Sequence, residues 1–427
     1  MTRRPPGAGP MNGLTATTRD RRLRWAVGLI AAMVYLATPE LMRVSHPDSD
    51  HFPKLARAFL AGRISIPLSN DPGFRTNELI PSANGDAYYC AYPPLPAVLL
   101  MPFVALFGTA ASCLWITRLM SAINVMLFDA VACRWSGTQK QPPLSLGARL
   151  AFDALFAFGT TTWHVARVGG DWQLAHAVTL AGGLLAAYEL LGAARPIRLG
   201  ACIAIVLLTR PTAALGCCFC LLPFIRRRNV HSLLKLMFIP GIACAMLGLY
   251  NAARFGSPFD FGYGRMILVG EGRELMLRYG QFHPHFILRN LFWFFAAPPW
   301  LMETGAIPIG YDPRGMSVFI ATPALLYGVV ALIRKWKEPL VRDSAISVAL
   351  ASVPLLLYFN TGYWQFGHRF SMDYLAAAMV LVMIGMGPKP SRLAVALVWL
   401  SVLIHLAGLW LPPTRIPVPE WITGTVA

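Results

Sequence analysis

The stretch "WAVGLIAAMVYLATPELMRVSHPDSDHFPKLARAFLAGRISI", residues 25–66, opens with an apolar run that ends near Met42. A helix needs about 20 predominantly apolar residues to cross a bilayer, so this run is long enough for one crossing. Asp48 and Asp50 follow the run directly, and an amphipathic segment follows them. The stretch therefore predicts a membrane span that delivers two carboxylates to a membrane surface.

The composition of the whole chain favours a membrane protein. Hydrophobic residues make up 56% of the 427 residues, charged residues make up 13%, and the mean hydropathy is +0.52. A soluble domain carries about 25% charged residues. Ten further apolar runs occupy residues 94–108, 112–133, 150–166, 173–193, 199–225, 233–252, 316–333, 344–359, 374–387 and 393–411. The predicted fold is thus an all-α polytopic membrane protein with about 11 transmembrane helices.

The distribution of basic residues predicts which side each loop faces. Residues 1–24 are rich in Arg, Pro and Gly and are predicted to be a disordered cytoplasmic tail, followed by a single transmembrane domain over residues 25–427. If each apolar run takes the chain to the other side of the membrane, counting from this tail puts three basic clusters on the cytoplasmic side, at residues 226–228, 334–337 and 389–392. Four basic residues fall on the opposite side, against the positive-inside rule: Arg134, Lys140, Arg195 and Arg198. The net charge of +17 therefore indicates membrane orientation and contact with anionic lipids, and nucleic acid is not expected as a partner.

The same alternation sends three polar stretches to the extracytoplasmic side, at residues 43–93, 253–315 and 360–374. Apolar residues recur at helical spacing over residues 52–64, which predicts a helix lying flat on the membrane in the first extracytoplasmic loop. The apolar segment 286–300 predicts a second interfacial helix in the fourth extracytoplasmic loop. Because sites are usually built from ordered loops on a rigid scaffold, we expect the functional site on this side.

The two acids after the first span have two explanations. An interfacial carboxylate close to Tyr88, Tyr89 and Tyr92 is suited to act as a general base, because partial desolvation raises its pKa. Alternatively, Asp48 or Asp50 caps the interfacial helix by accepting hydrogen bonds from free N–H groups. The residues alone favour neither explanation.

Several segments resemble the GT-C superfamily of integral-membrane glycosyltransferases, in particular relatives of protein O-mannosyltransferases and lipid A aminoarabinose transferases. The resemblance begins with "PDSDHFPKLARAFLAGRISI" and "GDAYYCAYPPLPAVLLMPFVALFG" in the first loop and second apolar run. It continues in "LLTRPTAAL", "YNAARFGSPFDFGYG", "DPRGMSVFIATPAL" and "YWQFGHRFSMDYL", and so extends over most of the chain after residue 25. Asp48 stands where the family places its catalytic acid, with Phe52 and Leu55-Ala56-Arg57 in the following helix.

The resemblance implies an inverting transfer of a sugar from a polyprenyl-phosphate donor to a glycan, lipid or protein acceptor. One carboxylate, Asp48, would take the acceptor's proton while a basic group offsets the charge of the departing phosphate. The chain departs from the family in two ways. Tyr92 stands where relatives often carry a phosphate-binding Lys, and the acids are spaced as Asp48-Ser-Asp50. An Asp-x-Asp pair can bind Mg²⁺ or Mn²⁺, although a lipid-phosphate donor requires no metal or other cofactor.

Phosphate binding is expected from basic residues of the extracytoplasmic loops. Arg369 is the first candidate, because a guanidinium binds phosphate oxygens bidentately. The alternative is a salt bridge between Arg369 and Asp373, which follows one helical turn later. His368 and Arg265 are further substrate-binding candidates. Arg210, beside Pro211, interrupts an apolar run and is either functional or part of a kinked helix.

A secondary transporter or lipid flippase is the alternative to a glycosyltransferase. Such a protein is also basic and polytopic, but it usually shows an internal repeat and acids near the middle of the bilayer. No repeat is visible, and the embedded acids Asp129, Asp153 and Glu189 stand near predicted helix ends. The compact loops favour a bacterial cytoplasmic membrane, with the active site on the extracytoplasmic side.

Overall fold

The computed structural model describes residues 18–40, 50–69, 78–138, 143–268, 271–301, 309–362 and 365–414. These residues are mainly helical. The α-helices are α1 (Thr18–Ala37), α2 (His51–Leu60), α3 (Leu95–Phe107), α4 (Cys113–Thr138), α5 (Leu146–Phe158), α6 (Thr161–Val168), α7 (Asp171–Leu190), α8 (Pro196–Leu207), α9 (Leu222–Arg226), α10 (Val230–Phe255), α11 (Glu271–Tyr279), α12 (Phe286–Leu291), α13 (Val318–Ala321), α14 (Leu326–Lys335), α15 (Pro339–Leu357), α16 (Leu375–Met386) and α17 (Arg392–Gly408). The 3₁₀-helical segments are η1 (Gly108–Ala110), η2 (Pro211–Cys220), η3 (Tyr263–Arg265), η5 (Pro323–Leu325) and η6 (Arg369–Asp373), and η4 (Phe292–Ala296) is a π-helical turn.

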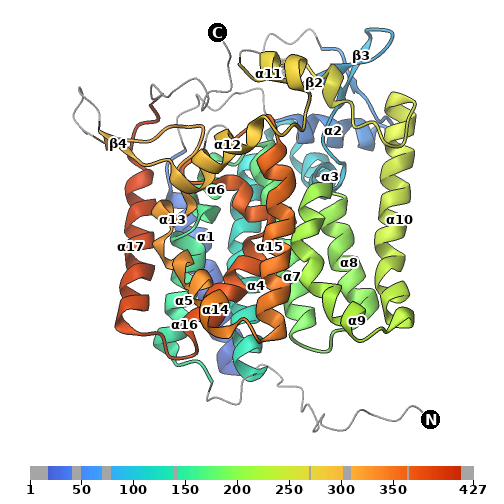
Figure 1. Cartoon of the computed structure of the whole chain (residues 1–427). Coiled ribbons are helices and arrows are strands. Elements are labelled where there is room, and N and C mark those ends of the chain that lie inside the picture. Colours follow the sequence, from blue (N-terminus) through green and yellow to red (C-terminus); the bar gives the residue numbers. More distant parts are fainter. Residues whose placement is uncertain are drawn as a thin grey trace.

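The described strands form two small antiparallel sheets. One sheet has the order β1 (Ile66–Pro67), β3 (Ala87–Cys90) and β2 (Leu79–Pro81), with Ile80 opposite Tyr89. The other pairs β4 (Trp300–Leu301) with β5 (Ile309–Gly310). Figure 1 shows both sheets, together with α2, α11 and α12, at one end of a bundle of roughly parallel helices. We call this the upper end, and the opposite end, which carries α9, the lower end.

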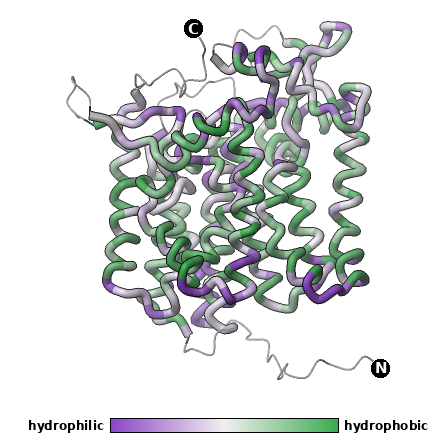
Figure 2. Tube along the Cα trace, in the orientation of Figure 1, coloured by the Kyte–Doolittle hydropathy of each residue, from purple (hydrophilic) through white to green (hydrophobic). Residues whose placement is uncertain are grey.

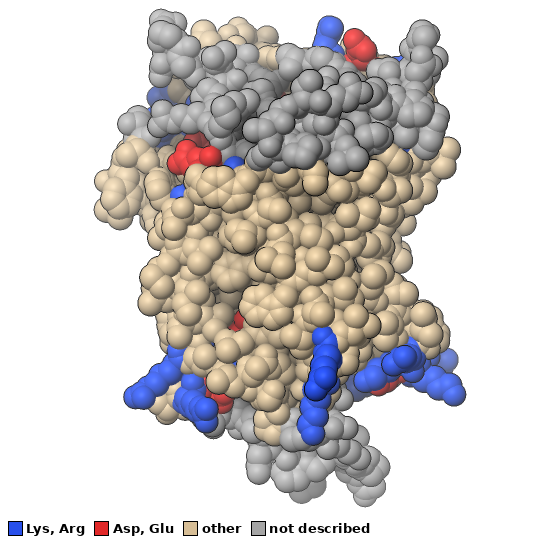
Figure 3. Space-filling view, turned by 90° about the vertical axis from the view of Figure 1, so that its left-hand side faces the viewer, with Lys and Arg blue, Asp and Glu red and all other residues tan. Residues whose placement is uncertain are grey.

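The bundle has a hydrophobic belt between its two ends. Figure 2 shows apolar residues along the middle of the helices and polar residues towards both ends. On the face seen in Figure 3, a broad belt carries few charged side chains, and Lys and Arg gather along its lower edge. Apolar side chains of α10 project outward, with Leu249 72% and Phe238 63% exposed. This surface suits contact with lipid hydrocarbon, and the basic edge suits a cytoplasmic face.

Three described helices, α4, α10 and α15, are long and apolar enough to cross a membrane. Helices α1 and α7, with 20 residues each, are not among these three. The remaining apolar runs correspond to shorter or interrupted helices, such as α5 followed by α6 and η6 followed by α16. The membrane class therefore agrees with the sequence analysis, whereas the count of 11 transmembrane helices stays a prediction.

The apolar run at residues 94–108 does not behave as a membrane crossing. It forms α3, whose 13 residues extend only about 20 Å at 1.5 Å per residue. The backbone N–H of Leu95 donates to the carbonyl of Leu208, and α3 packs beside α2 at the upper end (Figure 1). The next helix, α4, starts at Cys113, whose thiol donates to Asp171 at the same end. Both ends of α3 thus lie near the upper surface.

The apolar run at residues 199–225 was expected to cross the bundle once, and it makes two passes. Helix α8 ends at Leu207 and η2 restarts at Pro211, whose ring removes a backbone donor and prevents continuation of α8. Gly200, near the start of α8, approaches the start of α10 so closely that a Cβ would lie 2.2 Å from the Leu236 carbonyl oxygen. The start of α8 is therefore at the lower end, with α9. Arg195 and Arg198 consequently lie at the same end as residues 226–228, which removes their conflict with the positive-inside rule.

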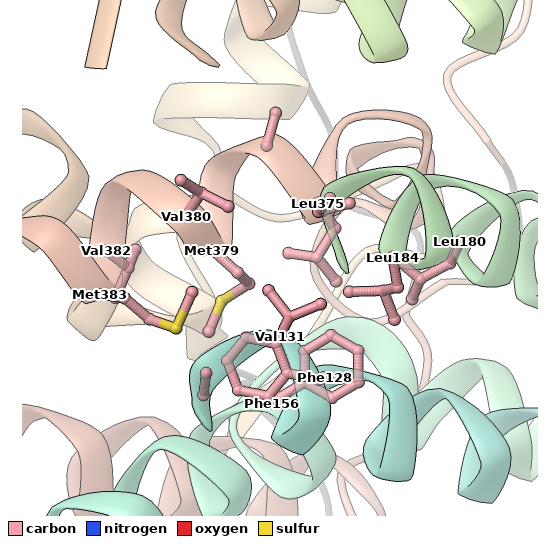
Figure 4. Packing of buried hydrophobic residues seen from close by; sticks show 14 of the residues in the cluster. Phe128, Val131, Phe156, Leu180, Leu184, Leu375, Met379, Val380, Val382 and Met383 are labelled. Carbon is pink, nitrogen blue, oxygen red and sulfur yellow. The ribbon is translucent and has the colours of Figure 1, made fainter. Parts of the chain in front are cut away.

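The core of the bundle is packed by aromatic and aliphatic side chains from α4, α5, α7 and α16 (Figure 4). Phe128 and Phe156 stack with ring centroids 4.4 Å apart and planes 9° apart. Gly385 allows α16 to approach α14, since a Cβ there would lie 1.8 Å from the Tyr327 carbonyl oxygen. This packing provides the rigid frame on which the upper end is built.

The expected helix at residues 52–64 is present as α2, which ends at Leu60. Phe52, Leu55 and Ala56 on its apolar face are fully buried within the protein, in a cluster shared with α3 and α7. The apolar face that the sequence assigned to the membrane is therefore covered by protein. The segment 286–300 forms α12 and the π-helical turn η4, which also bury part of their apolar surface. Contact of either segment with a membrane surface stays a prediction.

Candidate functional site

A cavity of about 220 Å³ opens at the upper end of the bundle. Its walls come from the first loop, the start of α7, the break between α8 and η2, the loop around η3, the end of α15 and η6. Aromatic side chains form much of the surface: Tyr92, Trp172, Phe261, Tyr263, Phe282, Tyr358, Phe359 and Phe370. Four charged residues line it: Glu78, Asp171, Arg210 and Arg369. An apolar cavity with a few convergent charges is the usual form of a small-ligand site.

Arg369 is the most unusual of these charged residues. Its side chain is only 3% exposed, and its guanidinium carbon lies 4.5 Å from the centroid of the Trp172 ring. Its Nε and Nη1 have no hydrogen-bond partner among the described residues. The backbone N–H of Arg369 donates to the Gln365 side chain at 2.8 Å, which fixes the start of η6. A buried cation with unsatisfied donors is costly, and an anion placed in the cavity would offset that cost.

The alternative pairing of Arg369 with Asp373 is wrong. Asp373 accepts two hydrogen bonds from Arg210, at 2.8 and 2.9 Å, and lies 3.2 Å from Nδ1 of His176. Arg210 is therefore anchored as a structural cation at the break between α8 and η2. Its guanidinium still faces the cavity over the Phe370 ring, at 5.4 Å from the ring centroid. The cavity thus contains one neutralised guanidinium and one whose charge has no salt-bridge partner among the described residues.

Glu78 introduces a carboxylate beside Arg369. Tyr92 donates its hydroxyl hydrogen to Glu78 Oε2 at 2.5 Å, and Trp172 Nε1 donates to the Tyr92 oxygen at 2.6 Å. Burial raises the pKa of Glu78 to about 7, although hydrogen bonding from Tyr92 and the charge of Arg369 oppose the rise. A carboxyl group that titrates near neutrality is suited to exchange protons.

Asp50 and Asp171 form a second acidic group next to the cavity. The Asp171 carboxylate accepts hydrogen bonds from the backbone N–H groups of His51, at 2.5 Å, and Phe52, at 2.9 Å. Asp171 therefore caps α2, and the Asp50 side chain makes no capping bond. Burial raises the pKa of Asp50, which contacts Cys113 and Ser112 instead. Asp50 does not line the cavity, and Asp48 lies outside the described residues.

Asp50, Asp171 and Cys113 are the candidate metal ligands, since their ligand atoms lie within 4.8 Å of one another. This donor set fits Mg²⁺ or Mn²⁺ poorly. These ions prefer oxygen ligands, and a thiol supplies a soft sulfur atom. The Asp171 oxygens already accept hydrogen bonds from His51, Phe52 and Cys113. No catalytic step is therefore assigned to a metal at this position.

The other predicted site residues lie apart from the cavity surface. Tyr88 and Tyr89 belong to β3, and Tyr89 packs edge-on against Phe255 at 5.7 Å. Arg265 is half exposed and forms a salt bridge with Asp260. His368 is fully buried and stacks on Phe294 at 3.6 Å. Of the six predicted substrate-binding residues, the structure brings Arg369 and Tyr92 to the cavity.

Sequence reasoning missed two acids of the site. Asp171 follows Gly-Gly and starts a helix, which was a detectable signal for a residue held at a helix boundary. Glu78 carried no such signal, because it stands in a loop with no recognisable spacing to another polar residue. Only the pairing of its segment with residue 267, where the Glu78 N–H donates to the Ile267 carbonyl, brings it to the cavity.

No family model matches the chain, and no curated protein sequence matches it. Among solved structures, the chain is similar to the oligosaccharyltransferase of Archaeoglobus fulgidus in its apo form. The identity is 13% and the TM-score 0.40, over 92% of this chain and 56% of the other. The chain thus spans just over half the length of that neighbour, and a likeness of this size carries no conclusion about activity.

Proposed function

We propose that this chain is an integral-membrane glycosyltransferase. It would move a sugar, with inversion, from a polyprenyl-phosphate donor to a glycan, lipid or protein acceptor on the extracytoplasmic side. The observation that carries the proposal is the buried guanidinium of Arg369, which faces an aromatic cavity with two nitrogen atoms that have no partner in the described part of the chain. The resemblance of the first loop and of the segment around Arg369 to GT-C enzymes supports it independently.

The charges of the cavity suit the departure of a lipid phosphate. Breaking the bond between the sugar and the phosphate leaves the bonding electrons, and hence additional negative charge, on the phosphate oxygen. A guanidinium already held in a site with little water stabilises this charge more than a solvated one does, because no reorganisation is needed. Arg369 is positioned by Gln365 and Trp172 for this role.

The position of the cavity suits a donor that is partly embedded in a bilayer. The cavity is at the upper end of an apolar bundle, and the end of α15 contributes Pro354 and Leu355 to its wall. Exposed apolar residues such as Val353 continue along α15 below it. A lipid whose tail lies in the membrane can therefore present its phosphate at this level, while the acceptor approaches from the aqueous side.

The most direct test is mass spectrometry of lipids that copurify with the protein. The wild-type chain is expected to carry polyprenyl-phosphate sugar or its product polyprenyl phosphate, and an Arg369→Gln variant is expected to carry much less. Proteoliposomes are then supplied with polyprenyl-phosphate hexoses and pentoses, and release of polyprenyl phosphate is measured. Movement of intact lipid-linked sugar across the bilayer with no bond cleavage would refute glycosyl transfer and favour a flippase.

A further inference from the structure

Glu78 is held in the cavity by a constrained backbone. Its φ angle is 65°, a left-handed conformation that is strained for a residue with a side chain. Two hydrogen bonds maintain it, because the Glu78 N–H donates to the Ile267 carbonyl at 2.8 Å and the Ile267 N–H donates to the Leu79 carbonyl at 3.0 Å. Backbone strain that the surroundings maintain in this way is frequent at functional sites.

The side chain of Glu78 is oriented by a chain of donors. Trp172 donates to Tyr92, and Tyr92 donates to one carboxylate oxygen of Glu78. Trp172 also lies against the guanidinium of Arg369, at 4.5 Å. One indole ring therefore contacts both the cation that we assign to the donor phosphate and the network that fixes the carboxylate. A carboxylate has about four acceptor positions, so the bond from Tyr92 leaves room for an acceptor hydroxyl.

The other acids near the cavity are committed to structural bonds. Among the described residues, Glu78 and Asp171 are the carboxylates that line the cavity. Asp171 accepts hydrogen bonds from two backbone N–H groups and a thiol, and Asp373 is held by Arg210 and His176. Asp50 lies behind Asp171, away from the cavity surface. Glu78 is thus the carboxylate among these that faces the cavity without serving a helix cap or a buried ion pair.

We infer that Glu78 is the general base of the proposed transfer, and this inference rests on the proposed function. The acceptor hydroxyl gives its proton to the Glu78 carboxylate as its oxygen forms a bond to the anomeric carbon. The bond between that carbon and the phosphate oxygen breaks, and its electron pair leaves with polyprenyl phosphate beside Arg369. Glu78 then returns the proton to solvent. This assigns the base to the last part of the first loop, about 30 residues after Asp48 in the sequence.

The surroundings of Glu78 set the pH dependence. It is faced by Arg369 from η6, Tyr92 and Cys90 from the first loop, Tyr263 from η3 and Tyr358 from the end of α15. Of these, Arg369 is charged near neutral pH. Glu78 must be ionised to accept a proton, so kcat/KM should rise with pH and level off above about 7, where the pKa of Glu78 lies.

The test compares Glu78→Gln and Glu78→Asp with a control, Asp86→Asn. Asp86 is an exposed acid of the first loop and lies between β2 and β3. Each purified full-length protein is placed in proteoliposomes with polyprenyl-phosphate mannose, glucose or arabinose, and with methyl glucoside and water to supply the acceptor hydroxyl. Release of polyprenyl phosphate is measured across the pH range, and binding of sugar-free polyprenyl phosphate is measured separately. We expect Glu78→Gln to lose about 10²–10⁴-fold in turnover and to retain phosphate binding. The rise of its kcat/KM with pH should be abolished. Glu78→Asp should keep part of the rate and still show the rise of kcat/KM with pH. Asp86→Asn should match wild type.

Two results would overturn the inference while leaving the proposed function intact. One is a Glu78→Gln variant that turns over donor like wild type with the same pH profile. The other is a variant that loses phosphate binding in proportion to turnover, because that marks a structural role. If Asp48→Asn abolishes the rise of kcat/KM with pH and Glu78→Gln retains it, the base is Asp48. If the wild-type protein neither binds nor cleaves any of the donors, the proposed function itself fails.

Discussion

The contribution of Arg369 can be predicted from its contacts. Its Nε and Nη1 are both buried and unpartnered among the described residues, so a phosphate placed there can receive two hydrogen bonds. A hydrogen bond to a charged group contributes about 1.5–3 kcal/mol, so two bonds contribute about 3–6 kcal/mol. Because each 1.4 kcal/mol corresponds to about tenfold, Arg369→Gln should reduce kcat/KM by about 10²–10⁴-fold. Solvent screening does not reduce this figure much, since the side chain is only 3% exposed.

Arg369→Lys separates charge from geometry. Lysine keeps a positive charge but presents a point charge in place of the planar fork, so roughly one of the two bonds should survive and the loss should be about 10–100-fold. Both variants keep the backbone N–H that donates to Gln365, so the start of η6 should be preserved. Thermal unfolding in detergent checks this: Arg369→Gln removes an unpaired buried charge and should leave Tm unchanged or raised, and Arg369→Lys should leave Tm close to that of the wild type.

The assay is release of polyprenyl phosphate from a polyprenyl-phosphate sugar in proteoliposomes, with binding of polyprenyl phosphate measured in parallel. The reasoning predicts that Arg369→Gln weakens phosphate binding and slows release, and that Arg369→Lys falls between it and wild type. Equal rates in all three proteins, with equal thermal stability, would refute the assignment of Arg369 to the donor phosphate. Equal losses in the Lys and Gln variants would show that fork geometry matters and charge alone does not.

Three further predictions concern stability and orientation. Asp373→Asn should destabilise the protein by about 3–5 kcal/mol, seen as a lower Tm, because it leaves a buried guanidinium without its counter-ion; an unchanged Tm would contradict this role. Gly385→Ala should cost about 1–3 kcal/mol or more, because the new Cβ would lie 1.8 Å from a carbonyl oxygen of α14, whereas Gly241→Ala, with nothing within 4 Å, is the control and should be tolerated. A cysteine at Asn84 should react with an impermeant maleimide in intact cells and one at Arg227 should not; the reverse labelling would invert the proposed orientation.

The sequence by itself determined the membrane class, because composition and the length of apolar runs reflect the surrounding solvent directly. It also predicted a helix over residues 52–64, which overlaps α2 at His51–Leu60, since helical periodicity depends on local spacing. It singled out Arg369 by chemical type, and its role stays a prediction. These conclusions need no knowledge of which segments meet.

The tertiary structure decided which apolar runs cross the bundle and which acids face the cavity. Residues 94–108 and 199–225 are both apolar, yet the first stays at the upper end as α3 and the second turns back at Pro211. Hydropathy measures transfer into an apolar environment and cannot distinguish lipid from protein as that environment. Likewise, Asp171 caps α2 and Glu78 reaches Arg369 only because segments distant in sequence pack together. Roles that depend on a partner across the fold require the partner's position, and sequence spacing does not contain it.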